Sequence, residues 1–143
     1  MLPEKVVTHL QMTNASQLRP ARTICGLVVT PVEDRAGQDQ ALLRSVHDRI
    51  APVHRWSSLA WSQRQWQDWL SDPRLHHWWI KLNDGVIGWG CLREHSGPEV
   101  ELDTFGIVPE DIGHGYGGYA LTLLTQTAWT LGAHFSFLRP RPN

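Results

Sequence analysis

The chain has 143 residues, a length that fits one domain with its own hydrophobic core. A composition of 41% hydrophobic and 19% charged residues excludes an intrinsically disordered chain. The formal net charge of −1 excludes a strongly basic surface for nucleic acid. Two cysteines are too few for a disulfide framework, and reduced thiols suit a cytoplasmic protein. The sequence shows no secretory signal and no apolar run long enough for a membrane span, so we expect no membrane partner.

The first elements expected are strands. Residues 6–12 alternate weakly between apolar and polar types, which indicates a short strand. Residues 24–30 are apolar and rich in β-branched side chains, and Pro31 follows them. This pattern predicts a buried strand, and we expect Cys25 to lie in the core.

Two helices are expected next. Apolar residues recur with helical spacing over 38–50, which predicts a helix that Pro52 ends. Ser62 followed three residues later by Gln65 predicts a capping box at the start of a second helix. The pair Asp72-Pro73 ends that helix.

The second half of the chain predicts three strands, a helix and one further strand. Runs at 78–82 and 86–93 flank Asn83-Asp84-Gly85, a turn typical of a β-hairpin. The remaining predicted elements are a turn at 96–98, a strand at 99–107, a glycine-rich loop at 113–118, a helix ending near Gly132 and a strand at 134–138. The order (β)βααβββα(β) is that of an α+β or α/β domain.

The glycine loop is the segment that carries chemistry. A glycine loop that opens a helix directs several backbone N–H groups at one point, where the helix N-terminus adds partial positive charge. Such a place binds phosphate without a lysine. A dinucleotide-binding loop would need an acid about 20 residues later, but no acid follows Asp111. A P-loop would need a lysine after the glycines, but the last lysine is Lys81. A plain turn without a ligand stays open, although four glycines in six residues make a costly turn.

The stretch from Glu99 to Ala128 resembles the central motif of the GNAT superfamily, the acyl-CoA-dependent N-acyltransferases. The family's loop runs Arg/Gln-x-x-Gly-x-Gly/Ala after a strand, and Gly115-Tyr116-Gly117 fit its last three positions. Ile112 stands where the family has Arg or Gln, which removes a side-chain donor, and His114 could supply one instead. The resemblance extends as element order over about residues 22–131. It implies an α+β fold with a central mixed, mostly antiparallel sheet flanked by helices.

The resemblance implies acetyl-CoA binding beside the strand before the loop. The pantetheine would pair with the backbone of that strand like an added β-strand, and the pyrophosphate would lie on the N–H groups of the loop. The residues implied in this site are Phe105, Gly106, Ile107, Ile112, Gly113, His114, Gly115, Tyr116, Gly117 and Gly118. No metal is expected.

Acyl transfer to a primary amine also needs a base, because an alkyl ammonium has a pKa near 10. Glu99, Glu101 and Asp103 alternate along the predicted strand and therefore share one face. That face is either a solvent-exposed side of the strand or the acceptor side of the cleft, where a carboxylate deprotonates the acceptor. We choose Glu101 as the base, since it matches a glutamate that many members of the resembled family carry. A backbone N–H near Ile107 could hold the oxyanion.

The adjacent histidines and the tryptophans are weaker indications of a functional site. His76 and His77 are adjacent on a strand and therefore face opposite ways, which makes them poor paired metal ligands. Trp56 and Trp61 are expected to pack against other aromatic residues, or to border the acceptor pocket as that region does in the resembled family. The acceptor is a small-molecule or peptide amine.

The C-terminus departs from the resembled family, whose members continue with a strand, a helix and a final hairpin. We expect an N-acetyltransferase-like domain at 1–132 and a divergent tail at 133–143, as in a truncated chain. Two functions stay open: an N-acetyltransferase, and a catalytically weak remnant that only binds acyl-CoA. An exposed sheet edge would favour association, for example as a homo-oligomer.

Overall fold

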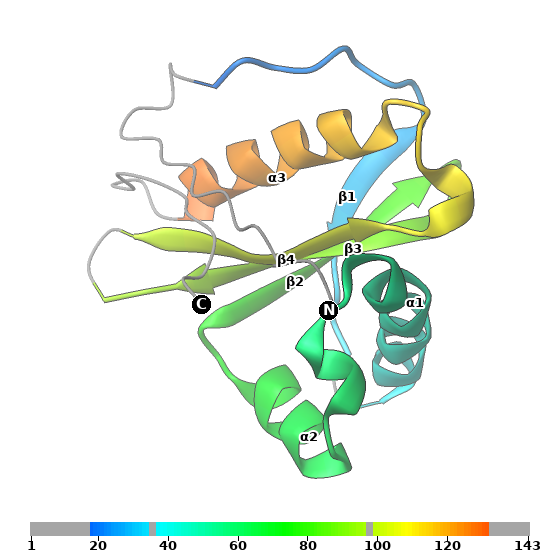
Figure 1. Ribbon diagram of the computed structural model, residues 1–143. Coiled ribbons are helices and arrows are strands. Elements are labelled where there is room, and N and C mark those ends of the chain that lie inside the picture. Colours follow the sequence, from blue (N-terminus) through cyan, green and yellow to red (C-terminus); the bar gives the residue numbers. More distant parts are fainter. Residues whose placement is uncertain (1–17, 35–36, 97–98, 132–143) are drawn as a thin grey trace, which may run out of the picture.

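The computed structural model describes residues 18–34, 37–96 and 99–131. Four antiparallel strands form one sheet in the order β1-β2-β3-β4. Helices α1 and α2 cover one face of the sheet and α3 covers the other (Figure 1). The elements are β1 Leu27–Pro31, α1 Gln38–His54, the 3-10 turn η2 Ser57–Ala60, α2 Gln63–Ser71, β2 Leu75–Leu82, β3 Gly85–Glu94, β4 Val100–Ile107, the 3-10 turn η3 Pro109–Asp111 and α3 Tyr116–Leu131. The expected α+β fold is therefore confirmed, while the strands predicted at 6–12 and 134–138 lie outside the described residues.

The turns and caps follow local sequence chemistry. Asn83 and Asp84 both have positive φ, 49° and 71°, as a two-residue hairpin turn between β2 and β3 requires. At the start of α2, the Ser62 hydroxyl accepts from the Gln65 N–H at 3.2 Å, and the Ser62 N–H donates to Gln65 Oε1 at 2.8 Å. Both the predicted hairpin turn and the predicted capping box are confirmed.

Two local expectations are wrong. Helix α1 does not end at Pro52 but continues to His54, with Pro52 inside its last turn. Arg55 adopts the left-handed conformation, and the N–H groups of Arg55 and Trp56 both donate to Ala51 O, which closes the turn without the missing proline N–H. Cys25 is exposed and lies outside the core, because β1 begins only at Leu27.

The two faces of the sheet differ in their packing. On the α1 and α2 face the core is aromatic, with Trp66, Trp79 and Trp89 buried against each other and against α1. On the α3 face the helix presents small and aliphatic residues, including the fully buried Leu124 and Ala128. Among the described residues, no helix is both long enough and apolar enough to cross a membrane.

Candidate functional site

The strand β4 changes register in the middle of its pairing with β3. Cys91 pairs with Thr104 and the next residue, Leu92, pairs with Leu102, so Asp103 is left as a bulge. Past the bulge, Glu101 lies opposite Arg93. Figure 1 shows β4 at the edge of the described sheet, with η3 leading from its end to the start of α3.

The far end of β4 offers backbone groups for pairing. The Val108 N–H donates to Ile87 O at 2.8 Å, so the backbone groups of Val108 point toward β3. Since backbone groups alternate sides along a strand, those of Ile107 and Phe105 point away from β3. Gly106 sits between them, where a Cβ would lie 2.4 Å from Ile50 of α1. A side chain at Gly106 would therefore push α1 away from this end of the strand.

The loop after η3, which we call the cradle, contains two glycines in the left-handed backbone conformation. Gly113 and Gly115 have φ of +91° and +81°, and a Cβ at either would meet no atom within 4 Å. Helix α3 begins at Tyr116, so Gly117 and Gly118 stand in its first turn rather than in the loop. The N–H groups of a first helical turn lack partners within the helix. A Cβ at Gly117 would lie 3.8 Å from Ile107, so the start of α3 and the end of β4 are adjacent.

The side chains around the cradle are sparse in charge. Ile112 is half exposed and offers no donor. His114 is exposed, and its ring stacks on Tyr116 with centroids 5.2 Å apart. In η3, Glu110 forms an ion pair with Arg49 of α1, which neutralises one of the two acids nearest the loop. Helix α3 has no acid in its first turn, so its N-terminal field is not opposed there.

Glu101 is not on a solvent-exposed side of the strand. The residue is only 3% exposed, and its Oε1 lies 2.7 Å from Nε2 of His95. Within the described residues its second oxygen, Oε2, is buried and has no hydrogen-bond partner. The solvent-facing alternative for this acidic strand is therefore wrong, since the side chain of Asp103 is also buried.

An ion-pair network centred on Arg93 lies next to Glu101, which is opposite Arg93 in register. Arg93 is 8% exposed, and its Nε donates to Asp103 Oδ1 at 3.3 Å. Its NH1 lies 3.7 Å from Asp72, the residue that ends α2. Arg74 donates to both carboxylate oxygens of Asp72, and this side-chain hydrogen bonding is the main cause that lowers the pKa of Asp72 to about 2.

His95 and Arg93 were not among the predicted site residues. The predicted turn at 96–98 could have placed His95 near Glu101, because a tight turn brings the residues on its two sides close together. The His95 N–H indeed donates to Glu99 O at 3.0 Å.

The segment between α1 and α2 is held by a buried histidine. His47 lies 2.6 Å through Nε2 from Ser58 Oγ and 2.9 Å through Nδ1 from Asp48 Oδ1. Burial is the main cause that lowers the pKa of His47, partly offset by Asp48. The Trp56 ring packs 5.8 Å from His47 and reaches Gly106. The expected aromatic packing of this segment is confirmed, and its role beside an acceptor stays a prediction.

The two adjacent histidines face opposite ways, as expected. His77 is buried beside Trp69 and Trp89, whereas His76 lies 3.3 Å from Glu94. In the part of the chain that the structure describes, no group of three His, Cys, Asp or Glu residues could hold a metal ion.

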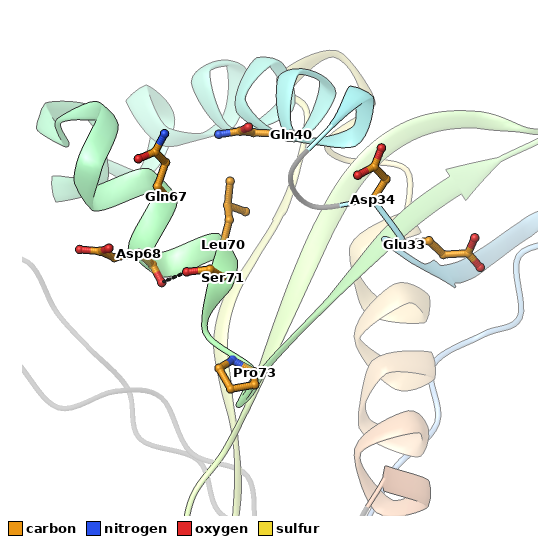
Figure 2. Close-up of a pocket in the computed structure, with 8 residues that line it drawn as sticks. All are labelled: Glu33, Asp34, Gln40, Gln67, Asp68, Leu70, Ser71 and Pro73. Carbon is orange, nitrogen blue, oxygen red and sulfur yellow. Dashed lines mark hydrogen bonds between the residues drawn. The ribbon is translucent and has the colours of Figure 1, made fainter.

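A separate open pocket of about 760 Å³ lies between the end of β1, the start of α1 and α2 (Figure 2). Its lining residues are Glu33, Asp34, Gln40, Gln67, Asp68, Leu70, Ser71 and Pro73. The pocket shares no residue with the glycine loop or with the Glu101 network.

Comparison with models of protein families shows to which family the chain belongs. The model of the acetyltransferase (GNAT) family matches residues 43–143, most of the chain. The chain belongs to the GNAT family. The match runs through 133–143, where we expected the resemblance to end.

Solved GNAT structures share this fold. A GCN5-related N-acetyltransferase from Kribbella flavida aligns with a TM-score of 0.63 and 10% identity, over 95% of this chain and 48% of that one. A GNAT family acetyltransferase from Elizabethkingia anophelis, solved with acetyl-CoA bound, aligns with a TM-score of 0.52 and 15% identity, over 75% and 60%. An aminoglycoside acetyltransferase from an uncultured soil metagenomic sample, solved with sisomicin, gives a TM-score of 0.60 and 11% identity, over 82% and 78%.

The chain thus spans about half the length of the Kribbella protein and 60% of the Elizabethkingia protein. No protein of curated function matches the sequence. At these identities the solved structures establish the fold alone, whereas the family rests on the match of the family model.

Proposed function

We propose that this chain is an acetyl-CoA-dependent N-acetyltransferase that transfers an acetyl group to a primary amine by direct attack in a ternary complex. The observation that carries the proposal is the open cradle of Gly113 and Gly115 at the start of α3, next to outward-facing backbone groups at the end of β4. A GNAT relative of the same fold has been solved with acetyl-CoA bound.

The described residues fit an acyl-CoA in two places. The N–H groups of Gly113–Gly118 would hold the pyrophosphate, where the absence of Cβ atoms in the loop permits close approach. The backbone groups of Phe105 and Ile107 would pair with the pantetheine amides. Because Ile112 has no donor, we assign any side-chain hydrogen bond to His114. Acetyl-CoA, when bound, supplies the activated acetyl group.

Glu101 would act as the general base in this proposal. It lies on the same strand as the pantetheine edge, four residues before Phe105, and its buried Oε2 has no partner among the described residues. Such an oxygen can accept a proton from the ammonium of an acceptor. The backbone N–H of Ile107 points to the same open edge and would stabilise developing negative charge on the acetyl oxygen.

The acceptor is a small-molecule or peptide amine. The buried carboxylates of Glu101 and Asp103, opposed by Arg93, favour a cationic group that brings its own positive charge. Sisomicin, bound by the soil-derived fold relative, illustrates such an acceptor.

The test is titration calorimetry of the full chain with acetyl-CoA, followed by an assay of acetyl-CoA consumption over a panel of amines. Gly115→Val should abolish binding. Gly115→Asn separates two causes, because asparagine tolerates positive φ and yet fills the cradle. Gly85→Ala is the control, since a Cβ there meets only ordinary contacts.

The outcomes are distinct. Binding by the wild type and by Gly85→Ala, but not by Gly115→Asn, supports the cradle. No binding by the wild type overturns the proposal. Binding without turnover on any amine would leave only the acyl-CoA-binding alternative.

A further inference from the structure

Little of Glu101 is exposed to solvent. Its side chain is 3% exposed, and one of its oxygens is closed off by the contact with His95 at 2.7 Å. A buried carboxyl that takes a proton in each turnover must release it before the next acceptor binds. A neighbouring group must therefore accept the proton from Glu101 and pass it to solvent.

Among the described residues, His95 is the one that the structure places in hydrogen-bond contact with the Glu101 carboxylate. Arg93 lies opposite in register, but a guanidinium stays protonated and cannot accept a proton. Asp103 is engaged by Arg93 and by the Thr104 hydroxyl, and Asp72 is engaged by both Arg74 and Arg93. Glu99 lies two residues away at the start of β4, and its backbone oxygen accepts from the His95 N–H.

His95 both contacts Glu101 and is partly exposed to solvent. Its Nε2 contacts Glu101, while 34% of its side chain is exposed, so one ring spans the distance from the buried carboxyl to solvent. An imidazole can accept at one nitrogen and donate at the other, and its charge changes readily in the neutral pH range.

We propose that His95 is the proton outlet of Glu101, a role that rests on the proposed function. Glu101 Oε2 takes a proton from the acceptor ammonium, which leaves a neutral amine and a neutral carboxyl group. While Glu101 is neutral, exchange with water converts His95 from the tautomer whose Nε2–H donates to Oε1 into the Nδ1–H tautomer, so that Nε2 can accept. The carboxyl group turns about its Cγ–Cδ bond and passes its proton to Nε2. The imidazolium then releases the Nδ1 proton to water, which restores the Nε2–H tautomer.

The test compares His95→Ala and His95→Gln with the wild type. If His95 carries the proton, both variants should lower kcat by about 10- to 100-fold, within the range of lost acid–base groups. The KM for acetyl-CoA should stay the same. Added imidazole should restore part of the kcat of His95→Ala, because the exposed position admits the free base. His76→Gln is the matched control, because His76 also contacts a glutamate, Glu94, but on the α3 face.

The glutamine variant separates transport from positioning. Its amide can still donate to Glu101 but cannot carry a proton, so a kcat near that of the wild type would overturn the outlet and leave a positioning role. In a Glu101→Gln background, His95→Ala should have no further effect, and an equal additional loss would also overturn the outlet.

The failure of this inference can be distinguished from failure of the proposed function. If the wild type binds acetyl-CoA and acetylates an amine but His95→Ala keeps its kcat, only the outlet is overturned. If the wild type acetylates nothing, both are overturned. The NMR chemical shifts of the His95 ring give a readout without turnover, and they should change between the wild type and Glu101→Gln, because Nε2 contacts Glu101 Oε1.

Discussion

Glu101 of β4 and His47 of α1 are both ionisable residues that are buried. The first is a buried acid whose Oε2 has no hydrogen-bond partner within residues 18–34, 37–96 and 99–131, and the second is a buried base with both ring nitrogens in hydrogen-bond contact. In a low-dielectric surrounding, an ionisable group that finds few partners is costly to keep charged. The expected consequences differ, because one affects turnover and the other affects stability.

Glu101→Gln tests the base directly. At neutral pH we expect a loss of about 10²–10⁴-fold in kcat/KM, because the amide cannot take a proton from the acceptor. The loss should shrink above about pH 9, where more of the acceptor amine is already neutral. Steady-state kinetics across pH 6 to 10 check this, and a loss of equal size at every pH would contradict the base role. Glu94→Gln, the carboxylate beside His76, is the matched control.

His47 makes the stability of the fold dependent on pH. Burial lowers the pKa of His47, so below about pH 6.5 the unfolded chain binds a proton that the folded chain does not. Stability should therefore fall as the pH drops from 7.5 toward 5, by up to about 1.4 kcal/mol per pH unit from this group. Above pH 7.5 His47 is neutral in both the folded and the unfolded chain, so its contribution to the pH dependence of stability should vanish.

Urea unfolding at several pH values measures this slope. His47→Gln should lower stability at all pH values, because it disturbs the link between α1 and η2, but it should flatten the slope below pH 6.5. His54→Gln, at the exposed end of the same helix, controls for the loss of one histidine. An unchanged slope in His47→Gln would show that other groups cause the acid sensitivity.

At the scale of elements, local signals were sufficient wherever the chemistry is local. The Ser62–Gln65 box and the turn at Asn83–Asp84 involve residues close in sequence, and both were predicted. The extension of α1 past Pro52 was missed, because it depends on the left-handed Arg55 that closes the last turn. Cys25 was misplaced because apolar composition alone does not show where a strand begins.

The parts of the candidate site that involve distant residues could not be predicted. The bulge at Asp103 arises from the pairing of β4 with β3, and no local pattern specifies it. Arg93 meets Asp72 only because α2 ends beside β3 in space. The glycine loop was accessible to sequence reasoning because glycine spacing is a local pattern. Strand alternation placed Glu99, Glu101 and Asp103 on one face, and the choice of Glu101 among them rested on the family resemblance and stays a prediction.

The capping box gives a prediction for α2 as an element. Ser62→Ala removes one acceptor and leaves the Gln65 N–H without its partner, so unfolding should cost about 1 kcal/mol less free energy. Thermal and denaturant unfolding measure the change. Ser45→Ala, exposed within α1, is the control and should be neutral or slightly stabilising. If the two variants are equally stable, the box does not stabilise the folded chain.

At the scale of the molecule, Arg93 joins three elements that are far apart in sequence. It lies on β3 and pairs with Asp103 on β4 and with Asp72 after α2. Arg93→Met should destabilise the fold by about 3–5 kcal/mol, because it leaves the buried Asp103 carboxylate uncompensated.

A double-mutant cycle checks the origin of that loss. Arg93→Met combined with Asp103→Leu should recover most of the stability, since no charge is then left buried. Denaturant unfolding of the four proteins gives the coupling energy. Simple addition of the two single effects would contradict the importance of this pair.

The opposite exposures of the two thiols give the chain a built-in reporter. Cys25 is open to solvent, whereas Cys91 has 0% exposure in the middle of β3. An aromatic disulfide reagent should react quickly with the Cys25 thiol. It should react with the Cys91 thiol only as fast as the central strand opens. The stoichiometry of the fast phase would count exposed thiols, and the rate of the slow phase would report the kinetic stability of the sheet. After Cys25→Ser, the fast phase should disappear, which leaves a probe confined to the strand beside Thr104.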